Sequence, residues 1–168
     1  MRQLLAALAL LSLGACTQPQ SDAEAVVREI YATAQEHLGR TATPHEAIPM
    51  SNDLRALVER AEAAADAREE PFIDGDLALD CQDCTSIDNL VIGPQRGPYN
   101  EPTEPGHHWV QASFMLNGDT ERTILWDLIE TPDGWRVHNV LTEGFNLRTE
   151  AAAYLADADA PAEAPAAP

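Results

Sequence analysis

Two cysteines stand three positions apart in the segment Cys81-Gln82-Asp83-Cys84, and this spacing permits three kinds of chemistry. A Cys-x-x-Cys unit can exchange thiols and disulfides, supply half of a metal site, or close a local disulfide. Redox catalysis requires a stabilised thiolate, usually beside a cation or a helix N-terminus. Here Asp80 and Asp83 adjoin the cysteines and disfavour the thiolate. We therefore favour a structural disulfide between Cys81 and Cys84.

A zinc site at these cysteines would need two more ligands, for which we consider His107 and His108. Adjacent residues of a strand point to opposite faces, so the two rings are poorly placed to share one ion. The nearby acids lack the spacing of an EF-hand calcium loop, and a solvated acidic loop fits them better. We predict no metal ligands, no cofactor and no catalytic residues. The acidic set comprises Asp74, Asp76, Asp80 and Asp83.

A third cysteine, Cys16, follows Leu-Gly-Ala at positions 13–15, behind a basic start and an apolar stretch over residues 4–13. The arrangement resembles a bacterial lipoprotein signal, because the stretch is shorter than the roughly 20 residues that span a bilayer. The resemblance implies cleavage before Cys16 and its lipidation, with two or more acyl chains as the membrane anchor. An ordinary secretory signal with an incidental cysteine is the alternative.

The residue after Cys16 is Thr17, whereas Asp at this position usually marks retention at the inner membrane in proteobacterial lipoproteins. By that resemblance we expect the periplasmic face of the outer membrane. The chain then divides into a signal peptide (1–15), a short tether (16–22), one folded domain (23–156) and an acidic tail (157–168). The tail is rich in Ala and Pro and has too little apolar bulk to order itself.

The charge balance narrows the range of partners. Removing residues 1–15 takes away one of ten basic residues and no acidic one, which leaves a formal charge of 9 − 28 = −19. Nucleic acid is excluded as a natural partner, because a polyanion is repelled by such a surface. An acidic surface favours solubility and fits a protein partner that carries a basic surface.

Apolar residues recur at helical intervals in two N-terminal segments. The first runs from about residue 22 to 38, with capping-box spacing at its start and Gly39 at its end. The second begins after Ser51, a predicted N-cap with Asp53 in the first turn, where the helix dipole favours an acid. A short third helix is expected over residues 147–155.

Strand signals dominate after His107. Residues 71–91 are expected to be irregular with one short strand or helical turn, and the proline-rich segment 93–106 is expected to be a loop. Alternating apolar residues up to Leu116, a turn at 117–119 and another at 131–134 predict an antiparallel meander with strands near 123–130 and 135–141. The layout is α+β: helices packed on a curved, cone-like antiparallel meander in a single domain.

The order of these motifs resembles a family of small bacterial lipoproteins and periplasmic proteins. That family is catalogued as a domain of unknown function and has a cone-shaped α+β fold similar to nuclear transport factor two. The resemblance covers about residues 23–156, although the cysteines on either side of Gln82 and Asp83 depart from it. It depends on residues 71–76, 82–83, 133–137 and 146–148 and on the long hairpin.

The resemblance singles out Gln82 and Asp83. Their amide and carboxylate could contact a ligand at the mouth of the cone or hydrogen-bond the loop backbone, and we favour the structural role. Trp135 and Arg136 have the same two interpretations. We expect the Trp to lie in the core and the Arg to pair with an acid.

Cone folds of this kind also host enzymes in which a pocket Asp or His abstracts a proton. Asp127 and His138, on neighbouring predicted strands, could form an acid–base dyad if both faced the interior. Strand alternation puts Asp127 and Trp126 on opposite faces, and we expect Asp127 to face outward.

We therefore expect a periplasm-facing lipoprotein that serves as a non-enzymatic binding or envelope-accessory module, held to the membrane by its lipid anchor. One alternative is an immunity or inhibitor protein against a basic partner. Another is a small-molecule enzyme that uses the cone pocket. An open apolar cavity with a desolvated Asp or His would favour catalysis. A filled cone with an exposed apolar or acidic patch would favour a protein partner.

Overall fold

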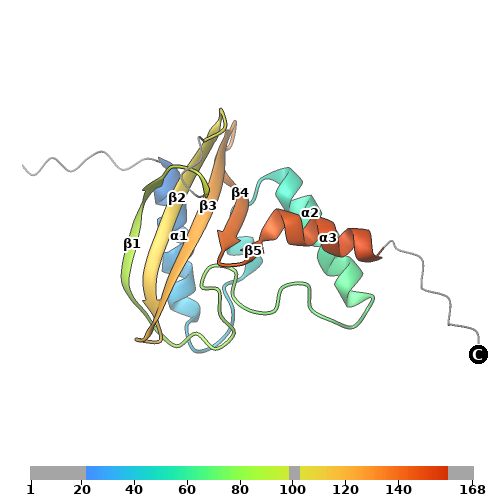
Figure 1. Cartoon of the computed structure of the whole chain (residues 1–168), viewed down its shortest axis with the longest axis horizontal. Helices are drawn as coiled ribbons and strands as arrows, with labels where there is room; N and C mark the ends of the chain where they lie inside the picture. The colour runs from blue at the N-terminus through green and yellow to red at the C-terminus, as the bar shows by residue number, and fades with distance from the viewer. Residues whose placement is uncertain (1–21, 99–102, 159–168) are drawn as a thin grey trace, which may run out of the picture.

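The computed structural model describes residues 22–98 and 103–158, so Cys16, the predicted signal peptide and most of the predicted tether and tail lie outside it. The described chain is an α+β domain with a five-stranded antiparallel sheet in the order β1-β2-β3-β4-β5 (Figure 1), which confirms the expected fold class. The elements are α1 (Asp22–His37), η1 (His45–Ala47), α2 (Asn52–Asp66), β1 (Ile87–Gln95), β2 (His107–Leu116), β3 (Thr120–Thr131), β4 (Gly134–Thr142), β5 (Phe145–Asn146) and α3 (Leu147–Ala158).

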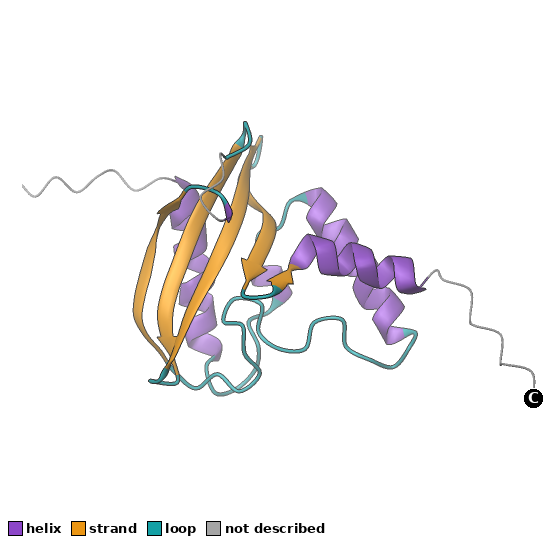
Figure 2. Ribbon diagram, viewed as in Figure 1, coloured by secondary structure: helices purple, strands orange, loops and turns teal. Residues whose placement is uncertain are grey.

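Helix α1 covers one face of the sheet and lies behind it in Figure 2. Its Tyr31 ring makes edge-on contacts with the rings of Phe114 and Trp126, at centroid distances of 5.6 and 6.2 Å. All three side chains are at most 2% exposed, so they fill the space between the helix and the sheet. The buried stripe of α1 follows the helical period and comprises Ala23, Val27, Ile30, Tyr31 and Ala34.

The β2–β3 hairpin sets which residues share a face of the sheet. Asn117 and Gly118 both have positive φ, of 52° and 81°, as a tight hairpin turn with right-handed strand twist requires. The turn pairs Leu116 with Thr120 and keeps this register to the pair His107 and Ile129. Even-numbered residues of both strands therefore face α1, and odd-numbered residues face away from it.

Helices α2 and α3 pack against each other beside β4 (Figure 1). Ser51 occupies the N-cap position of α2, but its hydroxyl donates to the carboxylate of Asp53 at 2.6 Å instead of capping the backbone. The backbone N–H of Ser51 bonds the carbonyl of Val137 at 2.8 Å and thereby ties the start of α2 to β4. Helix α3 runs to Ala158, three residues beyond the expected end. None of the described helices is long and apolar enough to cross a membrane.

Strand β1 corrects the predicted loop, because the strand continues to Gln95 through Gly93 and Pro94. These two residues pair with Gln111 and Val110 of β2. The sequence predicted a loop because proline lacks the backbone N–H that pairs with a neighbouring strand. Strand β1 lies at the edge of the sheet, where one side has no neighbouring strand and a proline is tolerated. Of the segment 71–91, expected to be irregular with one short strand or helical turn, residues 71–86 are irregular and residues 87–91 form the first part of the longer strand β1.

Candidate functional site

Asp76 anchors the irregular segment, and it corrects the prediction of a solvated loop at this position. Its side chain is only 5% exposed. One carboxylate oxygen accepts from the backbone N–H and hydroxyl of Thr43 at 2.6 and 2.7 Å. The other accepts from the backbone N–H groups of Ala78 and Leu79 at 2.8 and 3.1 Å. Because both oxygens are used within the fold, Asp76 is a structural residue.

The cysteines lie at disulfide distance in this segment, with the Cα atoms of Cys81 and Cys84 5.9 Å apart. Between them, the amide of Gln82 donates to Asp74 at 2.6 Å, and the backbone carbonyl of Asp83 accepts from the side chain of Asn117 at 3.1 Å. The side chain of Gln82 is thus held within its own loop. The carboxylate of Asp83 belongs to an exposed residue.

Trp135 and Arg136, the other predicted pair, lie at the start of β4. Trp135 packs at the edge of the core, with its ring 5.6 Å from that of His108. Arg136 donates to the backbone carbonyl of Trp135 at 2.9 Å, and within residues 22–98 and 103–158 it does not form the ion pair with an acid that we expected.

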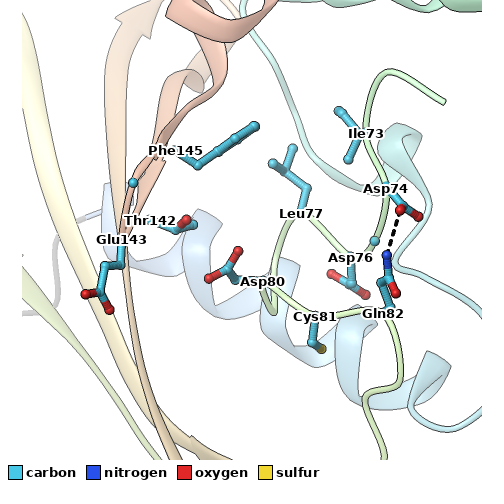
Figure 3. Close-up of a pocket in the computed structure, with 12 residues that line it drawn as sticks. Ile73, Asp74, Asp76, Leu77, Asp80, Cys81, Gln82, Thr142, Glu143 and Phe145 are labelled. Atoms are coloured by element: carbon cyan, nitrogen blue, oxygen red, sulfur yellow. Dashed lines mark hydrogen bonds between the residues drawn. The ribbon is translucent and has the colours of Figure 1, made fainter. Parts of the chain in front are cut away.

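A cavity of about 400 Å³ lies between this irregular segment and the turn that joins β4 to β5 (Figure 3). The apolar side chains of Ile73 and Leu77 line it from the irregular segment, and that of Phe145 lines it from the turn (Figure 3). Carboxylates line the same cavity, so it combines an apolar surface with negative charge. They belong to Asp74, Asp76, Asp80 and Glu143.

Two more cavities adjoin the first one at Glu143. One, of about 610 Å³, is lined by Leu125, Leu141 and Phe145, on the sheet face away from α1. The other, of about 390 Å³, is lined by Asp80, Arg122 and Glu143 among others. We call the three cavities together the Glu143 groove. Besides the buried Asp76, five carboxylates line it: Asp74, Asp80, Glu121, Glu143 and Glu150.

Arg122 is the one basic side chain among the described residues that line the Glu143 groove. Its Nε lies 3.6 Å from the carboxylate of Asp80, so its charge is largely offset locally. The groove as a whole therefore carries net negative charge and attracts cationic groups.

A second polar cluster lies on the same sheet face, nearer the start of β2. Nδ1 of His107 donates to the carboxylate of Asp127, 2.9 Å from each oxygen. Asp127 lies on the face opposite Trp126, as strand alternation predicts, yet its exposure is only 4% because neighbouring side chains cover it. Asp127 therefore points away from the core and is nevertheless shielded from solvent.

His138 joins this cluster through an irregularity in β4. Asp127 pairs with Asn139 and Leu128 pairs with Val137, so His138 is an extra residue on its strand. Such a bulge redirects a side chain. The ring of His138 stands perpendicular to that of His107, with centroids 5.0 Å apart.

Burial and charge shift the protonation of the cluster in defined directions. Burial raises the pKa of Asp127, while the hydrogen bond and charge of His107 oppose the rise. Burial also lowers the pKa of His138, and the adjacent Arg148 guanidinium lowers it further. Both effects favour neutral forms within the cluster.

Arg148 links the cluster to the start of α2. Its Nη1 donates to the carbonyl of His138 at 3.1 Å, and its Nη2 donates to Asp53 at 2.8 Å. Burial alone would raise the pKa of Asp53, but the hydrogen bonds from Ser51 and Arg148 outweigh it and lower the pKa to about 2. A cavity of about 240 Å³ opens here, lined by Trp109, Asn139 and the three cluster residues among others.

The sequence indicated part of this cluster. We considered Asp127 and His138 as a dyad, and the structure brings them together, but on the face away from α1 and not in the interior. We linked His107 to the cysteines and missed its true partner. The hairpin turn was the available signal, since it sets Trp109 opposite Asp127 and places His107 diagonally beside it on one face.

No family model matches the sequence, and no curated protein is significantly similar to it. A solved structure of a phospholipid-binding protein from Ralstonia solanacearum, in complex with a phospholipid, is weakly similar, with a TM-score of 0.36 and 12% sequence identity. The match covers 83% of this chain and 64% of that chain. So distant a likeness indicates nothing about the ligand of this protein.

Proposed function

We propose that this protein is a lipid-anchored, periplasm-facing binding module without catalytic activity, and that the Glu143 groove receives a basic, partly apolar segment of a protein partner. The observation that carries the proposal is the combination found in the groove. Apolar side chains of Ile73, Leu77 and Phe145 line the same cavity as several carboxylates. Apolar contact supplies affinity, and the surrounding charge selects a cationic partner.

The long-range charge supports the same kind of partner. With the signal removed, the formal charge is 9 − 28 = −19, and the groove concentrates carboxylates on one region of that surface. A field of one sign increases the association rate of oppositely charged proteins and weakens as salt is added. An immunity or inhibitor protein would use the same groove if its partner were a basic toxin or hydrolase.

The filled interior supports binding over catalysis in the cone. Tyr31, Phe114 and Trp126 occupy the space between α1 and the sheet. A substrate pocket of the cone type would need that space. The cavities of the Glu143 groove lie instead at the loop and on the outward sheet face, where a partner segment can reach them.

The test is affinity capture of the full chain from its own cell envelope after crosslinking, followed by mass spectrometry. Two groove variants are compared with the wild type: Glu143→Arg, which reverses a charge common to all three cavities, and Phe145→Ala, which removes apolar surface. The matched control is Glu29→Arg, which reverses an exposed charge on α1, the helix on the opposite sheet face.

We expect one stoichiometric protein partner, captured by the wild type and by the Glu29→Arg control. Both groove variants should lose it, and capture by the wild type should weaken as salt is raised. Capture that is equal in the wild type and both groove variants would contradict the groove as the binding site. The lack of any stoichiometric protein partner would contradict the proposed class of function.

A further inference from the structure

We propose that His107, Asp127 and His138 form a binding site for one transition-metal ion of the Zn²⁺ class, on the sheet face away from α1. One ring nitrogen of each histidine and one carboxylate oxygen of Asp127 lie within 4.8 Å of one another. None of the three residues lines the Glu143 groove, so this site is independent of the partner proposed above.

The donor set defines the class of ion. Two imidazoles and one carboxylate suit Zn²⁺, Co²⁺, Ni²⁺ and Cu²⁺, which accept nitrogen ligands readily. Calcium and magnesium require six or more oxygen ligands, or several retained waters, and a histidine pair serves them poorly. The side chain of Asp127 is also only 6% exposed. A buried carboxylate is stabilised by a neighbouring cation.

The position of the ion follows from the hydrogen bond between His107 and Asp127. Nδ1 lies 2.9 Å from both carboxylate oxygens, and the ion takes the place of the hydrogen between them. The neutral ring then carries its proton on Nε2, which lies 3.8 Å from the carboxylate of Glu104. That separation is too long for a direct hydrogen bond, so Glu104 acts on the ring through its negative charge.

The third ligand comes from the bulge in β4. Nδ1 of His138 lies 3.4 Å from Arg148 and 3.7 Å from Asp53, so we assign the other nitrogen, Nε2, to the ion. In a tetrahedral site with ligand bonds of about 2.1 Å, any two donors lie about 3.4 Å apart. The donor atoms, which lie within 4.8 Å of one another, therefore approach by up to about 1.4 Å when the ion binds.

The surrounding charges permit a cation despite the guanidinium of Arg148. That group donates to Asp53 at 2.8 Å, so the pair is close to neutral. Asp127 and Glu104 supply the remaining negative charge at the cluster. The three residues and Trp109 line a cavity of about 240 Å³, which has room for a further ligand such as water.

The experiment is a titration of the full chain with ZnCl₂ by isothermal calorimetry, in the Cys16→Ser background to remove a competing thiol and without a histidine tag. CoCl₂ is titrated in parallel for its visible absorption, and CuCl₂ for quenching of tryptophan fluorescence, to which Trp109 contributes from the cavity. The variants are Asp127→Asn, His107→Ala and His138→Ala. The controls are His37→Ala and His45→Ala, histidines whose partners are Thr41 and Glu62.

We expect one Zn²⁺ per chain in the wild type and in both controls. Each site variant should weaken binding by more than the roughly 10–100-fold that the loss of an outer-shell partner costs, and should reduce the cobalt absorption. Thermal unfolding checks that each variant folds, and His138→Gln, at a half-buried position, replaces any variant that does not. The absence of saturable one-to-one binding, unchanged affinity in His138→Gln, or loss of binding in the controls would each overturn the site.

Discussion

Nδ1 of His107 lies 2.9 Å from both carboxylate oxygens of Asp127, across the β2–β3 ladder. The two residues face away from the helix-covered core, yet the carboxylate is as well buried as many core side chains. A buried carboxylate is costly unless it is paired. The hydrogen bond between His107 and Asp127 should therefore contribute to the stability of the fold even when no ligand is bound at this site.

Removing His107 should destabilise the fold more than neutralising Asp127. His107→Ala leaves a buried carboxylate without its ring donor, and we expect a loss of about 2–3 kcal/mol in the free energy of unfolding. Asp127→Asn removes the charge and keeps an acceptor, so about 1 kcal/mol is expected. Urea unfolding in the presence of a metal chelator measures both, and the reverse order would contradict the pairing.

Asp76 should be the most sensitive acidic residue for stability. Asp76→Ala leaves the two donors of Thr43 and the backbone N–H of Ala78 without their acceptor, at positions that are at most 1% exposed, and Leu79 keeps only the backbone carbonyl of residue 76 at 3.3 Å. We expect a loss of about 3–4 kcal/mol in urea unfolding. Asp83→Ala is the matched control at an exposed site in the same segment and should change stability by less than about 0.5 kcal/mol. Equal effects of the two variants would show that Asp76 does not hold the loop.

The disulfide should contribute modestly. Joining Cys81 to Cys84 closes a loop of four residues, for which loop entropy gives about 2 kcal/mol. We expect the double variant Cys81→Ser and Cys84→Ser to fold, with its unfolding free energy lowered by about that amount. Failure of the double variant to fold in circular dichroism would show that the cysteines hold far more than a local turn.

The predicted lipid anchor at Cys16, which lies outside the described residues, can be tested by mass and by detergent partitioning. Wild-type protein should carry the mass of a lipid-modified N-terminal Cys16 and partition into the detergent phase of Triton X-114, because acyl chains bind apolar phases. Cys16→Ser should lose both properties and stay uncleaved. A wild-type mass that matches unmodified, cleaved protein would indicate an ordinary secretory signal.

Most of the architecture followed from local patterns. The helical stripe of Tyr31, the turn at Asn117 and the alternation along β2 depend on neighbours in sequence, and each predicted its element. The edge strand β1 did not, since the tolerance of Pro94 depends on where the strand lies in the sheet. No local pattern carries that information.

The sites were less predictable, because they depend on long-range contacts. The burial of Asp76 requires Thr43, thirty-three positions away, and the direction of His138 depends on a bulge that the alternation of β4 does not reveal. The Glu143 groove joins the irregular segment to the β4–β5 turn, so its shape appears only once β5 pairs with β4 at the edge of the sheet. The net charge of the sequence had indicated a basic partner, but it gave no information on where such a partner would bind.

The most direct test of partner binding in the Glu143 groove is site-specific photocrosslinking in intact cells. A photoreactive phenylalanine analogue replaces Phe145 in the groove or, as the control, Glu29 on α1. We expect a single protein adduct from position 145 and none from position 29, and Glu143→Arg in the same chain should abolish the adduct. No adduct at position 145, or the same adduct at both positions, would contradict binding in the groove.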